Sequence, residues 1–497
     1  MVSRLLVWVE TRTGFFISLA VLSLGFALLR LIRITVPASR VFDEVYSPLF
    51  AWKYLQGESF FDVHPLLAEF QHVPGLLLFG DTPLGWRISA WFWGIVFVWG
   101  TAFAAYFLIG RRLAGVLAAF LVSIDTAFFI YGRTGLPDMF LLSQFSLALL
   151  CFFASMRMSD RRWALLAALG SGVFLGNVVA TKWLGLAGVV SVWLWIAVQL
   201  TFQIIHRVKH CHVILSNSEG SRDRSEEQLA PMPQGPCPRA HLPNIPWWTY
   251  PVCFLLVPAL TYGLWLLPFL GLPPAISSQA MEAGWYGYVG AAWARLKEWH
   301  WQVWNYHAHL TATHPYGSRW WEWPLLRHPV LFFYETVPGA RPELVEGRRV
   351  INASGNIVLW WSGFAALVGG AGYALFPSLR ATRSNPGGVS HQIASSAAAS
   401  GLLAKTTILW MVLSALVFWL PWVFISRVSF NYHYFESFFF EVLLLTLLLV
   451  WLFDRPWYRV FAIAFLAAAV VGFVVLYPSA TGLLIPSSIS NIRWLFP

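Results

Sequence analysis

Long apolar runs, separated by short polar connections, account for most of the chain. A helix of about 20 consecutive apolar residues crosses the hydrocarbon core of a bilayer. By that measure we expect eleven spanning helices, near 14–32, 86–109, 113–130, 138–156, 163–181, 183–203, 248–270, 355–376, 404–425, 435–453 and 458–477. The run from 163 to 203 is interrupted only at Thr181–Trp183, and its length, about twice a bilayer span, favours two helices over one. The pattern predicts an all-α polytopic membrane protein, with 1–497 as a single membrane domain.

Three polar stretches are too long to be simple turns. The first, 33–85, contains the adjacent acids Asp43 and Glu44. The second, 204–246, is rich in Ser, Pro and charge in its middle part, which predicts disorder there. The third, 271–354, is rich in Trp, Tyr and His, and we expect it to lie on the membrane surface and line a binding cleft.

Composition agrees with this class of protein. Hydrophobic residues make up 58% of the chain and charged residues 11%, against roughly 25% charged in ordinary soluble domains. The net charge of +10 is scattered over short connections. Because the basic residues form no stripe or run, we interpret them as topology signals and headgroup contacts and expect no nucleic-acid partner.

The basic connections predict the orientation. In the eleven-span arrangement the connections with paired cations, such as Arg111–Arg112 and Arg455 with Arg459, all fall on one side, which the positive-inside rule makes cytoplasmic. The N-terminus is then inside and the C-terminus outside. Stretches 33–85 and 271–354 are external, and 204–246 is cytoplasmic. No cleavable signal peptide is evident, so we expect a multi-pass protein of the plasma membrane.

The cysteines indicate no metal centre. Cys211 and Cys237 lie near several histidines in the second polar stretch, but their spacing does not match the close ligand pairs of zinc sites. We therefore expect no zinc site there.

Ionisable side chains from separate segments converge on the predicted outer face. Acids, bases and cations at the rim of a membrane domain are candidates for an active site, although each also has a structural interpretation, such as capping a helix or anchoring at headgroups. Two adjacent carboxylates repel each other, and Arg40 is the one cation near them in sequence. The candidates are Asp43, Glu44, Asp62, His64, Arg133, Asp138, Lys182, His307, His314, Arg427, Tyr432 and His433.

Six ordered motifs resemble those of the protein O-mannosyltransferases, which belong to the GT-C superfamily of polyprenyl-phosphate-dependent glycosyltransferases. The motifs are Phe42–Val45, Phe60–Pro65, Thr181–Gly185, Asn305–Thr311, His314–Pro324 and Phe430–Tyr434. The match covers nearly the whole chain. No insert is large enough for the β-trefoil MIR domain of eukaryotic members, so the chain resembles the shorter bacterial form. It departs from the family at Leu66 and Glu69, where Pro and Lys are usual.

The resemblance implies a GT-C fold with about eleven spans and a polyprenyl-phosphate sugar, most simply mannose, as donor. The acceptor would be a Ser or Thr hydroxyl of a secreted or membrane protein, attacked at the outer face with inversion. Asp43 is then the candidate base and Glu44 a candidate for positioning the acceptor. Candidates for binding donor phosphate or substrate are His64, Arg133, Asp138, Lys182, His307, Arg427, Tyr432 and His433. No cofactor is expected, and a divalent metal stays open.

Two alternatives accompany this interpretation. The same chemistry with a lipid or glycan acceptor differs only in loop shape, which sequence barely separates. A transporter is the alternative from another class, but its charges would mark a path near the midplane. Here the charges gather at one face and no inverted repeat is apparent.

Overall fold

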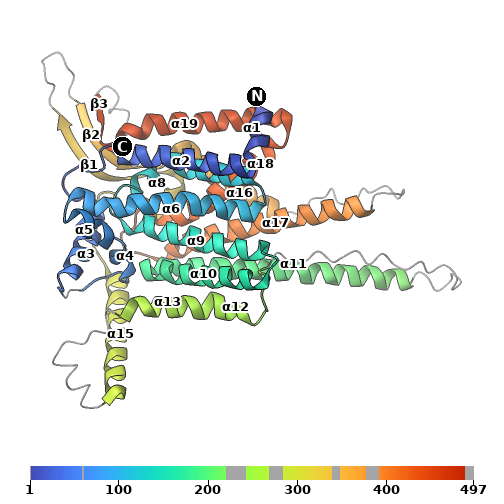
Figure 1. Cartoon of the computed structure of the whole chain (residues 1–497), viewed down its shortest axis with the longest axis horizontal. Helices are drawn as coiled ribbons and strands as arrows, with labels where there is room; N and C mark the ends of the chain where they lie inside the picture. Colours follow the sequence, from blue (N-terminus) through green and yellow to red (C-terminus); the bar gives the residue numbers. More distant parts are fainter. Residues whose placement is uncertain are drawn as a thin grey trace.

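The computed structural model describes residues 2–58, 61–219, 242–267, 284–337, 347–375 and 391–486. Within these residues, ten helical segments are long and apolar enough to cross a membrane. They run side by side along one axis of the molecule (Figure 1). They are carried by α2 (Arg12–Leu31), α6 (Pro83–Ile109), α9 (Pro137–Arg157), α10 (Arg161–Thr181), α11 (Leu186–Glu219), α12 with α13 (Thr249–Pro251 and Val257–Leu266), α16 (Ile357–Leu375), α17 (His391–Trp419), α18 (Phe435–Phe453) and α19 (Arg459–Thr481).

The expected span 113–130 is divided into two helices. The apolar helix α7 (Arg112–Ile124) is too short to count among the ten, and α8 (Thr126–Tyr131) follows after a break at Asp125. The Asp125 carboxylate caps α8 by accepting from the Phe128 N–H at 2.9 Å, and its other oxygen accepts from the Trp360 indole of α16 at 2.9 Å. A side chain that caps one helix and binds a second one thus breaks an apolar run that reads as continuous.

The run from 163 to 203 forms two helices, as expected. Lys182 has an extended backbone between α10 and the start of α11. The chain reverses there.

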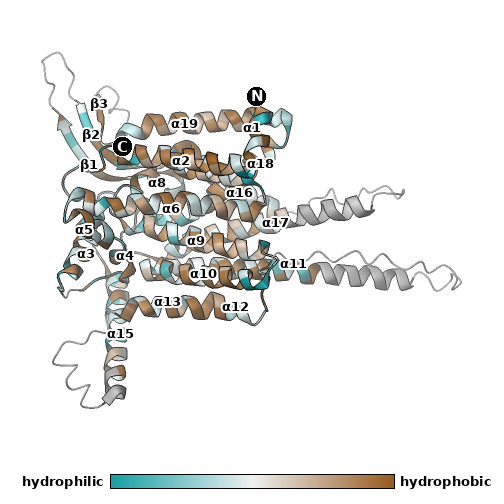
Figure 2. Ribbon diagram, in the orientation of Figure 1, coloured by the Kyte–Doolittle hydropathy of each residue, from teal (hydrophilic) through white to brown (hydrophobic). Residues whose placement is uncertain are grey.

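The two ends of the bundle differ in what they carry. One end, here called the loop end, carries the short helices α3 (Ser47–Leu55), α4 (Leu67–Phe70) and α5 (Val73–Phe79) (Figure 1). At the opposite end, here called the basic end, Arg111 forms ion pairs with Glu10 at 2.7 Å and Asp454 at 3.0 Å, next to α1 (Val2–Val9). Apolar colouring fills the length of the helices between the two ends (Figure 2).

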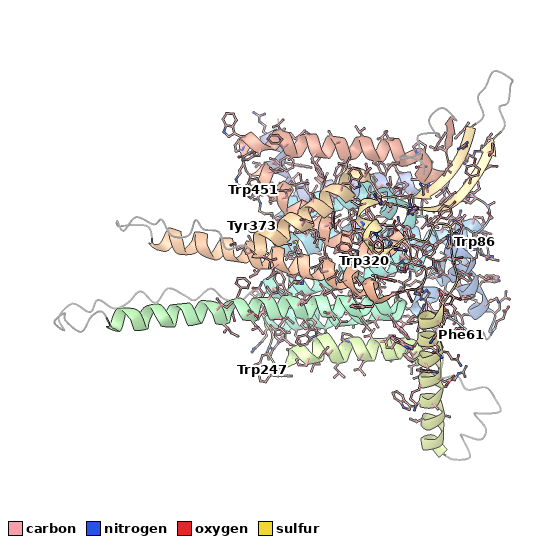
Figure 3. All side chains as sticks on the ribbon, turned by 180° about the vertical axis from the view of Figure 1, so that it is seen from behind. Phe61, Trp86, Trp247, Trp320, Tyr373 and Trp451 are labelled. Carbon is pink, nitrogen blue, oxygen red and sulfur yellow. The ribbon has the colours of Figure 1, made fainter. Side chains whose placement is uncertain are left out.

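Aromatic side chains mark both ends. Trp247 and Trp451 lie toward the basic end, whereas Phe61 and Trp86 lie toward the loop end (Figure 3). Trp247 is 83% exposed. Trp451 is also exposed, whereas Trp86 is buried, so the exposed amphipathic rings among these four lie at the basic end, as at a membrane interface.

A small antiparallel sheet at the loop end adds strands to a fold expected to be wholly helical. Strand β2 (Gly347–Ala353) lies between β1 (Val330–Val337) and β3 (Leu484–Pro486). Because β3 follows α19, the sheet joins the aromatic stretch to the end of the last span. From the same stretch, α15 (Gly284–His309) runs crosswise to the spans at the loop end (Figure 1).

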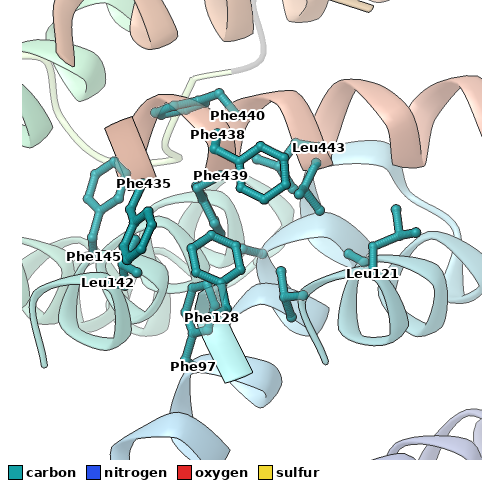
Figure 4. Packing of buried hydrophobic residues seen from close by; sticks show 14 of the residues in the cluster. Phe97, Leu121, Phe128, Leu142, Phe145, Phe435, Phe438, Phe439, Phe440 and Leu443 are labelled. Carbon is teal, nitrogen blue, oxygen red and sulfur yellow. The ribbon is translucent and has the colours of Figure 1, made fainter. Parts of the chain in front are cut away.

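Phenylalanines of α18 form the centre of the hydrophobic core (Figure 4). Phe435 and Phe438 lie 5.5 Å and 5.4 Å from the ring of Phe128 in α8, and Phe440 lies 5.8 Å from Phe145 in α9. Rings at these separations add specific aromatic contacts to burial of their area. The packing holds the start of α18 against α8 and α9, which places the residues that precede α18.

The polar stretch expected to begin at 204 starts later, because α11 continues to Glu219. Residues 220–241 lie outside the described residues, as do 271–283 and 338–346 of the aromatic stretch. The disorder expected in the first of these and the interpretation of Cys237 therefore stay predictions from sequence.

Candidate active site

A cavity of about 790 Å³ opens at the loop end. The first polar stretch, the start of α9, the turn between α10 and α11, the end of α15 and the segment before α18 all contribute to its walls. It brings together most of the residues that the sequence singled out. These are Asp43, Asp62, His64, Asp138, Lys182, His307, Arg427, Tyr432 and His433.

Asp43 is held at the cavity wall by the residue before it. Phe42 adopts a left-handed backbone with φ 46°, a strained conformation for a residue with a side chain. Its ring stacks on Phe332 at 5.3 Å and meets Phe430 edge-on at 5.3 Å. These contacts fix the turn of the short helix η1 (Phe42–Val45) and turn Asp43 toward the cavity.

The environment of Asp43 suits a base. Burial raises the pKa of Asp43 to about 6, while Lys182 opposes this rise and Asp138 adds to it. The Tyr432 side chain hydrogen-bonds the Asp43 carboxylate. Near neutral pH the carboxylate is therefore ionised but close to its titration range, where a general base works best.

Glu44, the second acid of the pair, does not line the cavity. Its two oxygens accept from Arg87 Nε and Nη2 of α6, each at 2.8 Å. They also accept the backbone N–H groups of Gly135 at 2.7 Å and Val41 at 3.1 Å, and the residue is fully buried. All of its strong acceptor directions are used within the protein, so the geometry does not support its expected role in positioning an acceptor.

The cation paired with Glu44 is Arg87, not Arg40, the cation nearest to the acidic pair in sequence. Arg40 forms its ion pair with Asp81 instead. The Gly135 backbone, which donates to Glu44, packs tightly against α6, because a Cβ on Gly135 would lie 2.6 Å from the Trp86 carbonyl oxygen. Only glycine allows this approach.

Arg133, expected to bind donor phosphate, lies outside the cavity. Its guanidinium donates to the Ile32 carbonyl at 2.8 Å and to the Ala480 carbonyl at 3.2 Å. These carbonyls belong to the C-terminal ends of α2 and α19, where the helix dipole favours a cation. Arg133 is 4% exposed, so the geometry assigns it to joining two helix ends.

Two cations do face the cavity. Lys182 Nζ lies 2.7 Å from an Asp138 oxygen and 5.3 Å from the centre of the Tyr432 ring. Arg427 forms no ion pair with any carboxylate in the described part of the chain. Its guanidinium lies 5.7 Å from the Trp422 ring. Burial lowers the pKa of Arg427, as expected for a cation that gains a partner only when an anion binds.

The histidines of the site are neutral hydrogen-bonding groups. The rings of His64 and His307 lie 6.2 Å apart. Burial lowers the pKa of His64 well below its usual range and that of His307 to about 4, with nearby cations acting in the same direction. His433 is packed between Trp422 and Tyr432, with ring centres at 4.1 Å and 4.3 Å.

Glu69 and Ser47 also line the cavity. The sequence marks Glu69 only as a departure from the family pattern and places neither residue among the site candidates. Glu69 is the single acid of the otherwise apolar turn α4 and is 1% exposed. Its neighbours in sequence carry no signal for its direction, because packing of α4 against the bundle decides where the carboxyl points. Among the described residues, no group of three or more His, Cys, Asp or Glu side chains is arranged to hold a metal ion.

Comparison with known proteins identifies the relatives of this chain. Residues 18–86 and 69–268 match the family model described as dolichyl-phosphate-mannose-protein mannosyltransferase. Residues 292–496 match the C-terminal four TMM region of protein-O-mannosyltransferase.

Among curated proteins, the chain is similar to polyprenol-phosphate-mannose–protein mannosyltransferases. It is 26% identical over 335 residues to that of Mycolicibacterium smegmatis, covering 60% of each chain. It is 25% identical over 394 residues to that of Mycobacterium tuberculosis, covering 70% of this chain and 68% of the relative. The match to the M. smegmatis protein therefore spans about 60% of that protein's length.

Among solved structures, the chain resembles the S. cerevisiae protein O-mannosyltransferase Pmt1-Pmt2 complex bound to the sugar donor. The TM-score is 0.69 at 16% identity, covering 97% of this chain and 92% of that one. At this identity the likeness shows the fold, and it confirms the fold class expected from the motifs.

Proposed function

Since the chain belongs to the protein O-mannosyltransferase family, we propose that it transfers mannose from a polyprenyl-phosphate donor to Ser or Thr hydroxyls of proteins. The reaction takes place at the external face of the plasma membrane and inverts the anomeric configuration. The observation that carries the proposal is the cavity in which Asp43 lies with two cations, Lys182 and Arg427.

Asp43 acts as the general base. The acceptor hydroxyl gives its proton to the Asp43 carboxylate as its oxygen forms a bond to the anomeric carbon. The bond between that carbon and the phosphate oxygen breaks, and its electron pair leaves with the polyprenyl phosphate. A single displacement without a covalent intermediate inverts the configuration.

Arg427 and Lys182 stabilise the departing phosphate. Negative charge grows on the phosphate oxygens as the bond breaks, and preorganised cations in a partly buried site stabilise it more than water does. Arg427 has its guanidinium available, and its planar fork suits phosphate. Lys182 is shared with Asp138 at 2.7 Å, so its charge is partly compensated before the donor binds.

The test is direct transfer by the purified protein. It is incubated with labelled polyprenyl-phosphate-mannose and a Ser/Thr-rich peptide, in parallel with lipid and glycan acceptors. We expect label in the peptide with inverted configuration, and turnover lowered roughly 10²-fold or more by Asp43→Asn. Label found only in a lipid or glycan would contradict the proposed protein acceptor. Wild-type turnover by well-folded Asp43→Asn would show that Asp43 is not the base.

A further inference from the structure

Glu69 lines the cavity and has one unused carboxyl oxygen. Its Oε2 is buried and has no hydrogen-bond partner among the described residues. The carboxyl also hydrogen-bonds the Ser47 side chain. Buried polar atoms are rarely left without a partner, and one that lines a cavity is most simply explained by a ligand that completes it.

The turn that carries Glu69 is firmly held. Gln71, two residues later, donates to Thr181 at 3.3 Å and accepts from Gln144 at 3.2 Å. His72 Nδ1 lies 3.2 Å from the Trp86 carbonyl oxygen. Because these contacts tie α4 to three spans, the direction of the Glu69 carboxyl is set before any ligand binds, as a specific binding site requires.

The chemistry of Glu69 suits a hydroxyl group. Burial raises the pKa of Glu69 well above its usual range, and nearby Asp62 raises it further. Burial thus favours the uncharged form of the carboxyl, which can both donate and accept a hydrogen bond, as a hydroxyl does.

We propose that Glu69 binds a hydroxyl of the donor sugar and so contributes to selecting which sugar is transferred. The inference rests on the proposed function, in which the acceptor contributes one reacting hydroxyl and Asp43 binds it. The remaining hydroxyls that enter the cavity belong to the sugar. Ser47 links Glu69 to the segment that carries Asp43, four residues earlier, so the sugar subsite adjoins the reacting centre.

The experiment compares polyprenyl-phosphate-mannose with donors that each lack one ring hydroxyl. Equilibrium binding and transfer to peptide are both measured for the wild type, Glu69→Leu and Glu69→Gln. Glu441→Gln is the control, because Glu441 is a fully buried carboxyl bonded by Tyr434 and does not line the cavity.

We expect the wild type to discriminate against one of the deoxy donors by roughly 10-fold or more, because loss of the matching hydroxyl leaves a buried polar group unpaired. Glu69→Leu should weaken binding of the parent donor and leave binding of that deoxy donor unchanged. The ratio of the two affinities should then fall toward one. Glu69→Gln keeps a donor and an acceptor and should retain part of the ratio. Glu441→Gln should leave the ratio as in the wild type.

Two outcomes overturn the inference. One is that the wild type binds every deoxy donor with the same affinity as the parent donor. This test does not depend on the folding of any variant. The other is a discrimination ratio that Glu69→Leu leaves unchanged. Selective binding without any transfer would support the sugar subsite and overturn the proposed function, so the two failures are distinguishable.

Discussion

At the scale of single residues, the adjacent acids Asp43 and Glu44 have opposite environments. Asp43 lines a cavity with one hydrogen bond from Tyr432, whereas Glu44 is enclosed by Arg87 and two backbone N–H groups. A carboxylate whose acceptor directions are all used cannot take a proton from a substrate without losing those bonds. This contrast is why the chemistry is assigned to Asp43.

The pKa of Asp43 predicts the pH dependence of transfer. The base is active when ionised, so kcat/KM should be half-maximal near pH 6, level off at higher pH and fall toward tenfold per unit at lower pH. Lys182 lowers the pKa of Asp43, so Lys182→Met should move the midpoint to higher pH. Profiles of kcat/KM for both proteins check this. Arg455→Met, at the basic end, should keep the wild-type midpoint, and an unmoved midpoint in Lys182→Met would contradict the assignment.

Arg427 and Arg133 predict opposite kinds of defect. Arg427→Ala should weaken binding of polyprenyl phosphate roughly 10-fold or more, because a charge-assisted hydrogen bond is lost, and Arg427→Lys should restore it only partly. Arg133→Ala should keep that affinity and lower the melting temperature, since two helix ends lose their cation. Affinity and melting temperature are measured on the same preparations. Weakened phosphate binding in Arg133→Ala alone would return Arg133 to the site.

At the scale of elements, the ion pair between Glu44 and Arg87 joins the first polar stretch to α6, and Gly135 adds the turn before α9. Arg87 also donates to the carbonyls of Ile34 and Pro37. The pair thus determines how the segment that carries Asp43 sits on the bundle.

Glu44→Ala should therefore destabilise the protein. Removing one partner of a buried ion pair leaves the other charge uncompensated, at a cost of roughly 3–5 kcal/mol. Thermal unfolding in detergent should show a large drop in melting temperature for Glu44→Ala and little change for Asp43→Asn. The double variant with Arg87→Met should recover part of the loss. A Glu44→Ala protein that is as stable as wild type but inactive would restore Glu44 to a chemical role.

At the scale of the whole molecule, the sheet and α15 lie at one end of the bundle (Figure 1). The cavity is lined by residues of that end, and Arg111 forms its ion pairs at the other. Cations gathered in connections face the cytoplasm by the positive-inside rule. We therefore expect the loop end to face outward, with α15 and its exposed Trp293 and Trp301 lying along the membrane surface.

Labelling of single cysteines tests this orientation. Gln56→Cys is exposed near the end of α3 at the loop end, and Ser159→Cys is exposed between α9 and α10 at the basic end. Both variants are made in a protein in which Cys211 and Cys237 are replaced by Ser. An impermeant thiol reagent added outside intact cells should label Gln56→Cys. It should label Ser159→Cys only after the membrane is opened. The reverse pattern would place the active site on the cytoplasmic side.

Local properties of the sequence were enough to predict the spans. Burial in a bilayer requires about 20 consecutive apolar residues, and such runs are read along the chain without knowing their neighbours. Ten of the eleven expected spans are confirmed by length and composition, and the reversal at Lys182 is as expected. Asp43, Lys182 and Arg427 were also found this way, because each is a charge beside an apolar run.

Tertiary structure alone decided which polar groups pair. Glu44 meets Arg87, 43 residues away, and Arg133 meets the carbonyl of Ala480, 347 residues away. Such pairs depend on how helices pack, and no local pattern encodes them. The break at Asp125 has the same cause, because α16 supplies part of its hydrogen bonding. The direction of Glu69 into the cavity depends likewise on the spans that hold α4. The sequence therefore determined which residues stand at the membrane rim, and packing of distant helices decided which of them face a substrate.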